Sequence, residues 1–306
     1  MKPPYPSLTS EWHDKTYPAI DPKRSELSAK GKTIVISGGG SGIGRGIAQA
    51  FALAGASAIA ILGRRQALLE ETKQLIASEQ PGTTVSTHIT DVTDSLTVQK
   101  AAREVGQWDV LVSNAGYLSS KAPLVESDEA EWWRSFEVRP MPSYAMRVEQ
   151  SLARDSQINV KGSYNLTKAF MPSRKPHSTI ISVNAGSIQV PGPFSAGFSS
   201  YNSSKFAVLK MFEILAVENP DVHVVSMHPG VVDTEMKRKN DMPSPHMDAV
   251  ELPSHFAVWL CSHEAKFLRG KFVWSNWDVE EMMAKRTEIE TSMLLTANCI
   301  GWPFTT

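Results

Sequence analysis

Tyr201 and Lys205 are the side chains in this sequence whose types and spacing most clearly indicate chemistry. They stand four residues apart in "YNSSK", inside a segment from about Tyr201 to Glu218 that predicts a helix, so both lie on one helical face. A free tyrosine titrates near ~10, and an ammonium about 4 Å away at an effective dielectric of about 20 would lower that pKa by roughly three units before burial offsets part of the effect. We therefore expect the Tyr201 phenol to titrate close to neutrality and to exchange a proton with a carbonyl or alcohol oxygen. On an isolated surface helix such a pair would mean little, so its context decides.

The elements that must position this pair alternate between strands and helices. Helical patterns cover 45–55, 66–78 and 95–105, and strands are expected at 32–37, 58–62, 85–89, 109–113, 179–184, 222–227 and 271–274. Most of these strands are too apolar to have a solvated face, which is typical of a parallel sheet covered on both sides. The sequence therefore predicts an α/β doubly wound Rossmann fold, a seven-stranded parallel sheet with helices on both faces.

This fold is expected to form one catalytic domain over 31–280. Residues 1–30 are polar, dotted with proline and without a regular period, so they predict an N-terminal extension that lies on the surface or is partly ordered. Residues 281–306 are interpreted as a C-terminal tail.

A run of glycines follows the first predicted strand, in "SGGGSGIGRG" (37–46). Gly38 allows a tight turn, Gly42 lets the backbone approach a pyrophosphate, and Gly44 lets the helix pack on the strand. The free N–H groups at the start of the helix would face phosphate oxygens. A strand before these glycines and a helix after them make a dinucleotide site a specific prediction.

The end of the second strand, "ILGRR", predicts which dinucleotide binds. Sites selective for NAD place an acidic residue after this strand, whereas here Gly63 is followed by Arg64 and Arg65. A guanidinium can pair with a ribose 2′-phosphate that a carboxylate would repel, so the sequence favours NADP as the cofactor. The alternative is that both arginines are ordinary surface residues at a helix start.

Composition excludes several other function classes. The 306 residues carry 31 Lys and Arg against 32 Asp and Glu, so no single-sign charge field favours nucleic acid or an anionic membrane. No apolar run approaches the ~18 to 20 residues of a membrane span, and a cytoplasmic location is expected. Cys261 and Cys299 form no metal-binding pattern, so no metal site is predicted.

Taken together, these motifs resemble the short-chain dehydrogenase/reductase family. The glycine spacing is GxxxGxG, and it is joined by "DVTD" after the third strand, "NAG" (114–116), "YNSSK" and "HPGVVDTEM" over about residues 31–275. The C-terminal part, "ELPSHFAVWLCSHEAKFLRGKFVWSNWDVEEM" with the closing "GWPF", looks like a fungal branch of that family.

The resemblance implies roles for the catalytic residues. It makes Tyr201 and Lys205 the catalytic pair, and it implies that Asn159 completes a proton relay by holding a water near the lysine. The family also uses a serine about thirteen residues before the tyrosine. Here Ser187 lies fourteen residues before Tyr201 and is the preferred candidate, with Asn184 as the alternative.

The resemblance also implies further contacts with the cofactor. Asp91 would meet the adenine, Asn114 would lie along the cofactor or act mainly in the structure, and Val232 and Thr234 would meet the carboxamide side. The complete expected cofactor set is Gly38, Gly42, Ile43, Gly44, Arg64, Asp91, Asn114, Lys161, Tyr201, Lys205, Val232 and Thr234.

Residues 139–158, "RPMPSYAMRVEQSLARDSQI", interrupt an otherwise helical pattern. Removing them joins Val138 to Asn159 and restores that pattern, and Pro140 and Pro142 would each cost a helix about 3 kcal/mol. The segment is either a surface insertion or an unspliced intron translated with the gene, and we favour the intron. The family's usual subunit contact involves this helix, so homo-oligomer formation is also an open expectation.

The sequence thus predicts an NADP-dependent oxidoreductase, a carbonyl reductase or alcohol dehydrogenase. Its partner would be a small-to-medium, partly apolar metabolite, and the fungal look suggests secondary metabolite biosynthesis. An epimerase or dehydratase is less favoured. The alternative from another class is a catalytically weak NADP-binding protein that acts through a partner or as a redox sensor.

Overall fold

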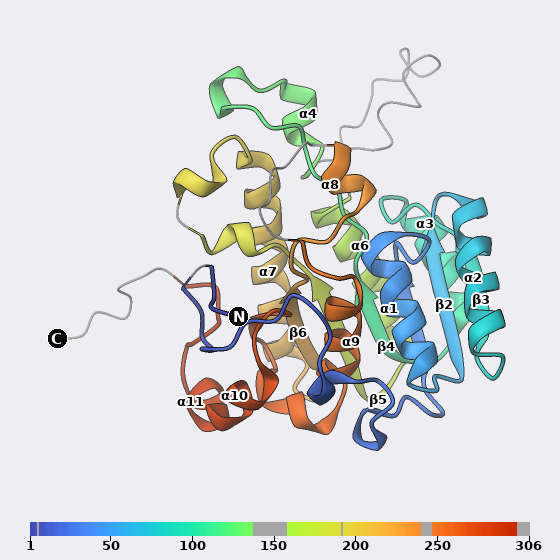
Figure 1. Ribbon diagram of the computed structural model, residues 1–306. Helices are drawn as coiled ribbons and strands as arrows, with labels where there is room; N and C mark the ends of the chain where they lie inside the picture. Colours follow the sequence, from blue (N-terminus) through green and yellow to red (C-terminus); the bar gives the residue numbers. More distant parts are fainter. Residues whose placement is uncertain (5, 137–157, 191, 240–246, 299–306) are drawn as a thin grey trace, which may run out of the picture.

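The computed structural model describes residues 1–4, 6–136, 158–190, 192–239 and 247–298 (Figure 1). Its centre is a parallel sheet whose strands follow the order β3-β2-β1-β4-β5-β6-β7. The strands are β1 Thr33–Ser37, β2 Ala58–Gly63, β3 Thr84–Ile89, β4 Trp108–Ser113, β5 Arg174–Val183, β6 His223–His228 and β7 Phe272–Trp274. The reversal of strand order between β1 and β4 confirms the doubly wound fold predicted from the apolar runs.

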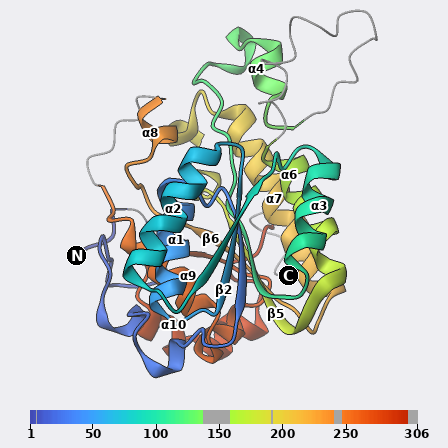
Figure 2. The same cartoon turned by 90° about the vertical axis from the view of Figure 1, so that its right-hand side faces the viewer.

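Helices cover both faces of the sheet. Figure 2 shows α1, α2 and α9 on one side of the strands and α3, α6 and α7 on the other. The helices are α1 Gly42–Leu53, α2 Gln66–Glu79, α3 Ser95–Val105, α4 Glu129–Trp133, α6 Val160–Phe170, α7 Ser199–Glu218, α8 Glu235–Lys239, α9 Glu251–Leu260, α10 Val279–Ala284 and α11 Arg286–Thr291. The short α4 projects beyond the end of the sheet in both views.

The buried strands explain this three-layer arrangement. Side chains of a strand alternate between its two faces, so Ile34 and Ile36 pack in the layer of α1 and α9 while Val35 packs in the layer of α3 and α7. All three are fully buried, and each contributes roughly 1.5–3 kcal/mol by leaving water. The strand is apolar throughout because both of its faces are covered.

The N-terminal residues differ from the surface extension that the sequence predicts. Trp12, Ile20 and Leu27 are buried and belong to the same hydrophobic cluster as α9 and α10. These side chains come from irregular backbone and from short 3₁₀ helices. Their spacing therefore has no helical or strand period that would predict their burial. The described part of this segment is therefore anchored to the core through these side chains.

The segment 139–158 lies almost wholly outside the described residues. Ile158, its last residue, is described and buried, and α6 begins two residues later at Val160. The surface-insertion and intron hypotheses both stay predictions.

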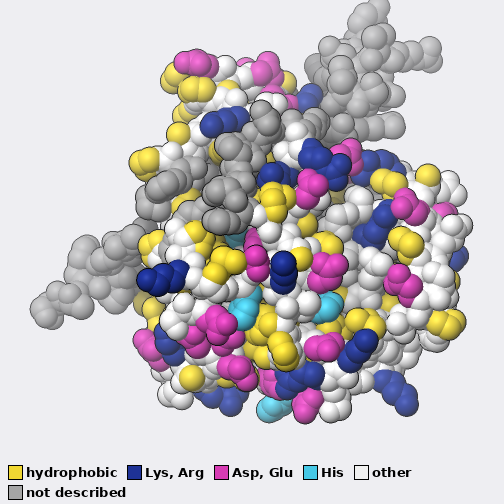
Figure 3. All heavy atoms as spheres, in the orientation of Figure 1, with side chains coloured by type: hydrophobic (Ala, Val, Ile, Leu, Met, Phe, Trp, Pro, Cys, Tyr) yellow, Lys and Arg dark blue, Asp and Glu magenta, His cyan; other side chains and the backbone are white. Residues whose placement is uncertain are grey.

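The surface in the orientation of Figure 1 mixes acidic and basic side chains, as Figure 3 shows. This matches the nearly balanced charge count of the sequence. Within the part of the chain that the structure describes, no helix combines the length and hydrophobicity needed to cross a bilayer.

Candidate active site

A cavity of about 500 Å³ opens at the carboxyl ends of the strands. Its wall begins at Gly38 after β1 and continues with Arg64 after β2, Thr90 after β3 and Asn114 after β4. Tyr201 and Lys205 from α7 line the same cavity. In doubly wound sheets this edge, next to the reversal of strand order, is where ligands bind.

The glycine loop forms one wall of the cavity, and its close packing leaves no room for larger residues. Gly38 has φ +71°, and a Cβ at this position would lie 2.8 Å from Asn114 Nδ2. A Cβ on Gly44 would collide with the carbonyl oxygen of Gly38, where helix α1 crosses the end of β1. Gly42 opens α1 with φ +52° and lines the cavity together with Ile43. The start of a 12-residue helix therefore faces the cavity and can receive an anion.

Asn114 holds this loop in place. Its Nδ2 donates to the carbonyl oxygens of Ser37 at 3.0 Å and Gly38 at 3.4 Å, and its backbone N–H donates to Ser37 Oγ at 3.0 Å. The side chain lines the cavity and fixes the β1 end at the same time. These hydrogen bonds give Asn114 a structural role, one of the two roles that the sequence leaves open.

Two arginines lie at the end of β2. Arg64 and Arg65 both line the cavity, and Arg65 Nη1 is 2.7 Å from Glu235 Oε2 in α8. Both partners of this ion pair are largely exposed, so the pair contributes at most about 1 kcal/mol and can open readily. A phosphate group at this end of the cavity would meet two guanidinium groups.

Asp91 lies just after β3, the strand that pairs with β2. Its Oδ1 accepts hydrogen bonds from the backbone N–H of Thr93 at 2.9 Å and from Thr93 Oγ1 at 2.7 Å. This local turn orients the carboxylate at the cavity wall.

Tyr201 and Lys205 lie one helical turn apart on α7, as their spacing predicts. Lys205 Nζ is 5.9 Å from the centre of the Tyr201 ring and donates to the carbonyl oxygen of Val183 at 3.0 Å. Burial raises the pKa of Tyr201 to about 12 and lowers the pKa of Lys205 to about 8. The expectation that Lys205 brings the Tyr201 pKa close to neutrality is therefore wrong for this arrangement. The same desolvation disfavours the charged form of both groups.

Asn159 is buried beside the pair. Its Oδ1 accepts from the backbone N–H of Tyr117 at 2.8 Å, and its Nδ2 donates to the Tyr117 carbonyl at 2.9 Å and to Ser204 Oγ at 3.0 Å. These contacts connect the chain after β4 to helix α7. The Asn159 side chain thus fixes the position of Tyr117, after β4, relative to α7, the helix that carries Lys205. The water-holding role implied by the resemblance stays a prediction.

The two candidates for the serine role are both committed to other partners. Ser187 Oγ donates to Asn202 Oδ1 at 2.6 Å, and Ser187 is not among the residues that line the cavity. Asn184 does line it, but its Nδ2 donates to the Lys205 carbonyl at 3.1 Å and its Oδ1 accepts from the Ala185 N–H at 2.8 Å. Both side chains are thus hydrogen-bonded within the protein, and the assignment of the substrate-binding role to Ser187 stays a prediction.

The remaining expected cofactor residues separate into two groups. Thr234 lines the cavity next to Gly42, where a Cβ would lie 3.1 Å from the Thr234 methyl group. Val232 and Lys161 are not among the lining residues. Val232 is a buried residue of the loop after β6, and Lys161 lies in the first turn of α6.

Tyr117 is a cavity residue that the sequence reasoning did not identify. Its hydroxyl donates to Glu131 Oε1 at 2.6 Å, and Arg134 pairs with the other oxygen of the same carboxylate. Burial raises the pKa of Tyr117. Its position directly after "NAG", whose three residues also line the cavity, was the available signal.

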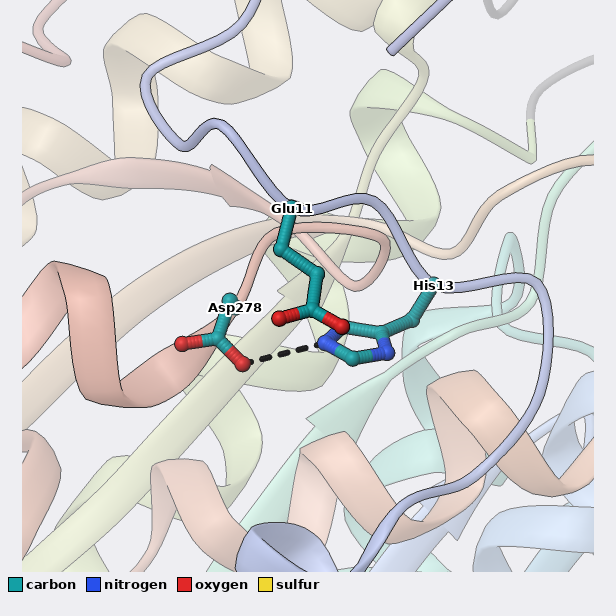
Figure 4. Close-up of side chains that lie close together, drawn as sticks. All are labelled: Glu11, His13 and Asp278. Atoms are coloured by element: carbon teal, nitrogen blue, oxygen red, sulfur yellow. Dashed lines mark hydrogen bonds and ion pairs between the residues drawn. The ribbon is translucent and has the colours of Figure 1, made fainter. Parts of the chain in front are cut away.

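One group among the described residues could offer metal ligands, and it lies outside the cavity lining. The ligand atoms of Glu11, His13 and Asp278 lie within 4.8 Å of one another. Figure 4 shows the Glu11 carboxylate beside the His13 ring, and His13 Nε2 is 3.0 Å from Asp278 Oδ2. His13 and Asp278 thus form a hydrogen bond between two distant chain segments, and Glu11 beside them is exposed.

Comparisons with known proteins identify the family. The family model described as short chain dehydrogenase matches residues 32–244. A short chain dehydrogenase/reductase of Aspergillus novofumigatus, nsrO, is 31% identical over 291 residues, covering 93% of each chain. A short chain dehydrogenase of Monascus purpureus, mpl6, is 32% identical over 302 residues, covering 94% of this chain and 95% of the relative.

Solved structures show the same fold. The short chain dehydrogenase from Shigella flexneri matches with a TM-score of 0.68 at 22% identity, covering 82% of this chain and 93% of that chain. The L-sorbose reductase of Gluconobacter frateurii, solved with NADPH and L-sorbose, matches with a TM-score of 0.65 at 23% identity, covering 81% of this chain and 96% of that chain. With the family model covering the glycine loop, the Tyr201 and Lys205 pair and most of the sheet, the chain belongs to the short-chain dehydrogenase/reductase family.

Proposed function

We propose that this protein is an NADP-dependent carbonyl reductase or alcohol dehydrogenase acting on a small-to-medium, partly apolar metabolite. One observation carries the proposal. The paired Tyr201 and Lys205, the glycine loop and the two arginines after β2 all line a single cavity. Family membership supports an oxidoreductase, and the cavity residues support the finer assignment.

The cavity residues fit an NADP molecule. The glycines leave space that a Cβ would fill, the start of α1 can bind phosphate oxygens, and Arg64 and Arg65 offer guanidinium groups for a 2′-phosphate. The cofactor, when bound, would supply or accept the hydride. No acidic side chain follows β2 to bind a ribose 2′-OH, which favours NADP over NAD.

Tyr201 would supply the proton in the direction of reduction. Because burial raises its pKa to about 12, the phenol is protonated at neutral pH and can donate to a carbonyl oxygen. Lys205 titrates near 8 and is charged at neutral pH, so its ammonium can stabilise the phenolate that remains. In the oxidative direction the same pair would accept the alcohol proton.

The experiment that tests this proposal compares two tyrosine variants. Tyr201→Phe should reduce NADPH consumption with a panel of ketones by about 10²–10⁴-fold, the usual contribution of a general acid. Tyr164→Phe is the matched control, because Tyr164 also has a lysine four residues later, with Lys168 Nζ 3.0 Å from its hydroxyl, but lies on α6 outside the cavity lining. Equal turnover by the wild type and Tyr201→Phe would refute the assignment of Tyr201.

A catalytically weak NADP-binding protein is the second candidate. It is favoured because Ser187 is hydrogen-bonded to Asn202 and Asn184 is hydrogen-bonded to the Lys205 carbonyl, so both candidates for the serine role already have protein partners. This candidate predicts that the wild type binds NADPH with micromolar or better affinity yet consumes none with any ketone of the panel. Binding together with turnover excludes it.

The biological setting stays a prediction. The fungal origin of the matched relatives supports our proposal of a role in fungal secondary metabolism. The cytoplasmic location and the homo-oligomer remain expectations from the sequence.

A further inference from the structure

The loop after β6 has no regular structure to hold it, although it forms part of the cavity wall. Pro229 and Thr234 line the cavity, and the residues between them connect β6 to α8. Gly230 has φ +77°, so the chain turns sharply at the start of this loop. We call residues 229–234 the cofactor loop. Something outside the loop has to fix its position.

Asp248 makes the contacts that fix the cofactor loop. Its Oδ2 accepts from the Val231 N–H at 2.6 Å, and its own N–H donates to the Val231 carbonyl at 2.9 Å. Val232 and Asp248 also form an isolated parallel bridge. A Cβ at Gly230 would collide with Asp248 Oδ2, so the carboxylate occupies space that only glycine leaves open.

Asn276 connects Asp248 to the beginning of the chain. Its Nδ2 donates to Asp248 Oδ1 at 3.0 Å and to the His13 carbonyl at 2.8 Å, and the residue is 1% exposed. The His13 N–H donates back to the Asn276 carbonyl at 2.8 Å. The Ala249 N–H donates to the Asp14 carbonyl at 2.8 Å, so the residue after Asp248 is tied to the same stretch.

Residues 9–14, which we call the N-terminal segment, are themselves firmly anchored. The Trp12 ring packs edge-on against Trp274 with the ring centres 5.8 Å apart, and Trp274 stacks on Trp277 at 6.0 Å. His13 is paired with Asp278, as Figure 4 shows, and the N–H groups of Ser10 and Glu11 donate to the Glu281 carboxylate. The segment therefore offers a fixed point against which the cofactor loop can be held.

We propose that Asp248 is a positioning residue for cofactor binding, holding the cofactor loop through Asn276 against the N-terminal segment. The inference rests on the proposed function, because it assigns Asp248 to the nicotinamide side of the same cavity. The glycine loop and the arginines, which would hold the adenosine half, make none of these contacts. Loss of Asp248 should thus weaken the binding of the nicotinamide half and leave the adenosine half unaffected.

The test compares NADPH with adenosine 2′,5′-bisphosphate, which lacks the nicotinamide half. Binding of both ligands is measured by titration calorimetry for the full chain, alongside the melting temperature of each variant. Asp248→Ala should weaken NADPH binding by about tenfold or more and change the affinity for the bisphosphate by less than twofold. Asn276→Ala should show the same split with a smaller factor, since the contact to Val231 is kept.

Asp109→Ala is the matched control. Asp109 also accepts one backbone N–H, from Thr33 at 2.7 Å, and one side-chain donor, Lys175 Nζ at 2.7 Å. It lies at the start of β4, at the opposite end of the strands from the cavity. Asp109→Ala should lower the melting temperature and should not weaken NADPH binding more than binding of the bisphosphate.

The affinities of the variants test the positioning role of Asp248, whereas NADPH binding by the wild type tests the proposed function. An unchanged NADPH affinity in folded Asp248→Ala, or equal weakening of both ligands, overturns the positioning role. If Asp248→Ala does not fold, Asn276→Ala decides by the same two affinities. A wild-type chain that binds no NADPH contradicts the proposed function itself, and the inference falls with it.

Discussion

At the scale of single residues, desolvation governs the chemistry of the Tyr201 and Lys205 pair. The phenol, whose pKa burial raises to about 12, is an acid that stays protonated through the physiological range. The lysine, whose pKa burial lowers to about 8, is the group of the pair that titrates near neutral pH. The pH dependence of the reaction should accordingly report Lys205.

We predict that reduction slows as the pH rises through about 8, because Lys205 then loses its proton and no longer stabilises the phenolate. The value of kcat/KM for a ketone, measured from pH 6 to 10, should fall about tenfold per pH unit above that point. Lys205→Arg keeps its charge in this range, so any residual activity of that variant should lack the alkaline fall. A wild-type profile that is flat to pH 9.5 contradicts this assignment.

Sequence reasoning succeeded for residues whose role depends on local spacing and failed where the role depends on surroundings. Motif spacing and strand order predict that Gly38, Gly42, Tyr201 and Lys205 lie at one site, and all four line the same cavity. The shift of the Tyr201 pKa was missed because it depends on burial by residues distant in the chain. Ser187 was selected by its distance along the chain, which does not specify that its hydroxyl bonds to Asn202.

At the scale of elements, the crossing of α1 over the end of β1 limits what the glycine loop tolerates. A Cβ on Gly44 would collide with the Gly38 carbonyl oxygen, which forms part of the loop backbone and cannot move aside cheaply. The packing of α1 on β1 and the shape of the proposed phosphate site therefore both depend on the absence of a Cβ at Gly44.

Gly44→Ala should consequently displace α1 from the strand and reduce the affinities for NADPH and for adenosine 2′,5′-bisphosphate together, by about tenfold or more. It should also destabilise the protein by about 1–3 kcal/mol, the usual cost of overpacking. Gly82→Ala is the control, because a Cβ there has no neighbour within 4 Å and the turn is remote from the cavity. Calorimetric binding and urea denaturation of both variants measure the two effects. Unchanged ligand binding by Gly44→Ala is the contrary result.

The end of β2 decides the choice of cofactor in our proposal. Arg64→Asp should weaken NADPH binding by roughly 10–100-fold, as expected when a charge-assisted contact worth about 1.5–3 kcal/mol is lost, and should narrow the preference over NADH. Arg103→Asp, an exposed position on α3, makes the same change in net charge away from the cavity. Fluorescence titrations with both cofactors separate the local effect from the change in overall charge. Equal losses in the two variants speak against a 2′-phosphate contact at Arg64.

At the scale of the whole molecule, β6 carries two histidines, the buried His223 and the half-buried His228. Burial lowers the pKa values of His223 and His228 to about 3, against a usual value near 6.5. Between these values the unfolded chain binds protons that the folded chain does not. The stabilising effect of neutral histidine is therefore complete above about pH 6.5 and is lost as the pH falls toward 3.

We predict acid destabilisation from this pair. Each histidine contributes a slope of about 1.4 kcal/mol per pH unit, so the melting temperature should fall by roughly 5–10 °C between pH 6.5 and pH 5. The double variant His223→Gln, His228→Gln should show a smaller fall, and His263→Gln, which is exposed, should behave like the wild type. Calorimetric scans at the two pH values compare them, and parallel falls in all three proteins would mean that other groups dominate.

The overall fold was predictable because each central strand is apolar on both faces and each is followed by a distinct turn or helix start. The seven strands and their parallel arrangement follow from these local signals. The docking of the N-terminal segment was not predictable, because its contacts join residues about 270 positions apart and involve isolated side chains such as Trp12. A single aromatic residue between prolines carries no period from which burial could be inferred.

The contact between His13 and Asp278 also has a consequence for how the molecule comes into being. The two residues are 265 positions apart, so the N-terminal segment has to wait for the last strand and α10 to leave the ribosome before it can dock. Closing so long a stretch of chain is a slow event that follows local helix and strand formation. The central sheet can assemble while synthesis continues, whereas the cofactor loop gains its support only at the end. A nascent chain would thus form its central sheet before its cofactor loop is held in the position proposed for cofactor binding.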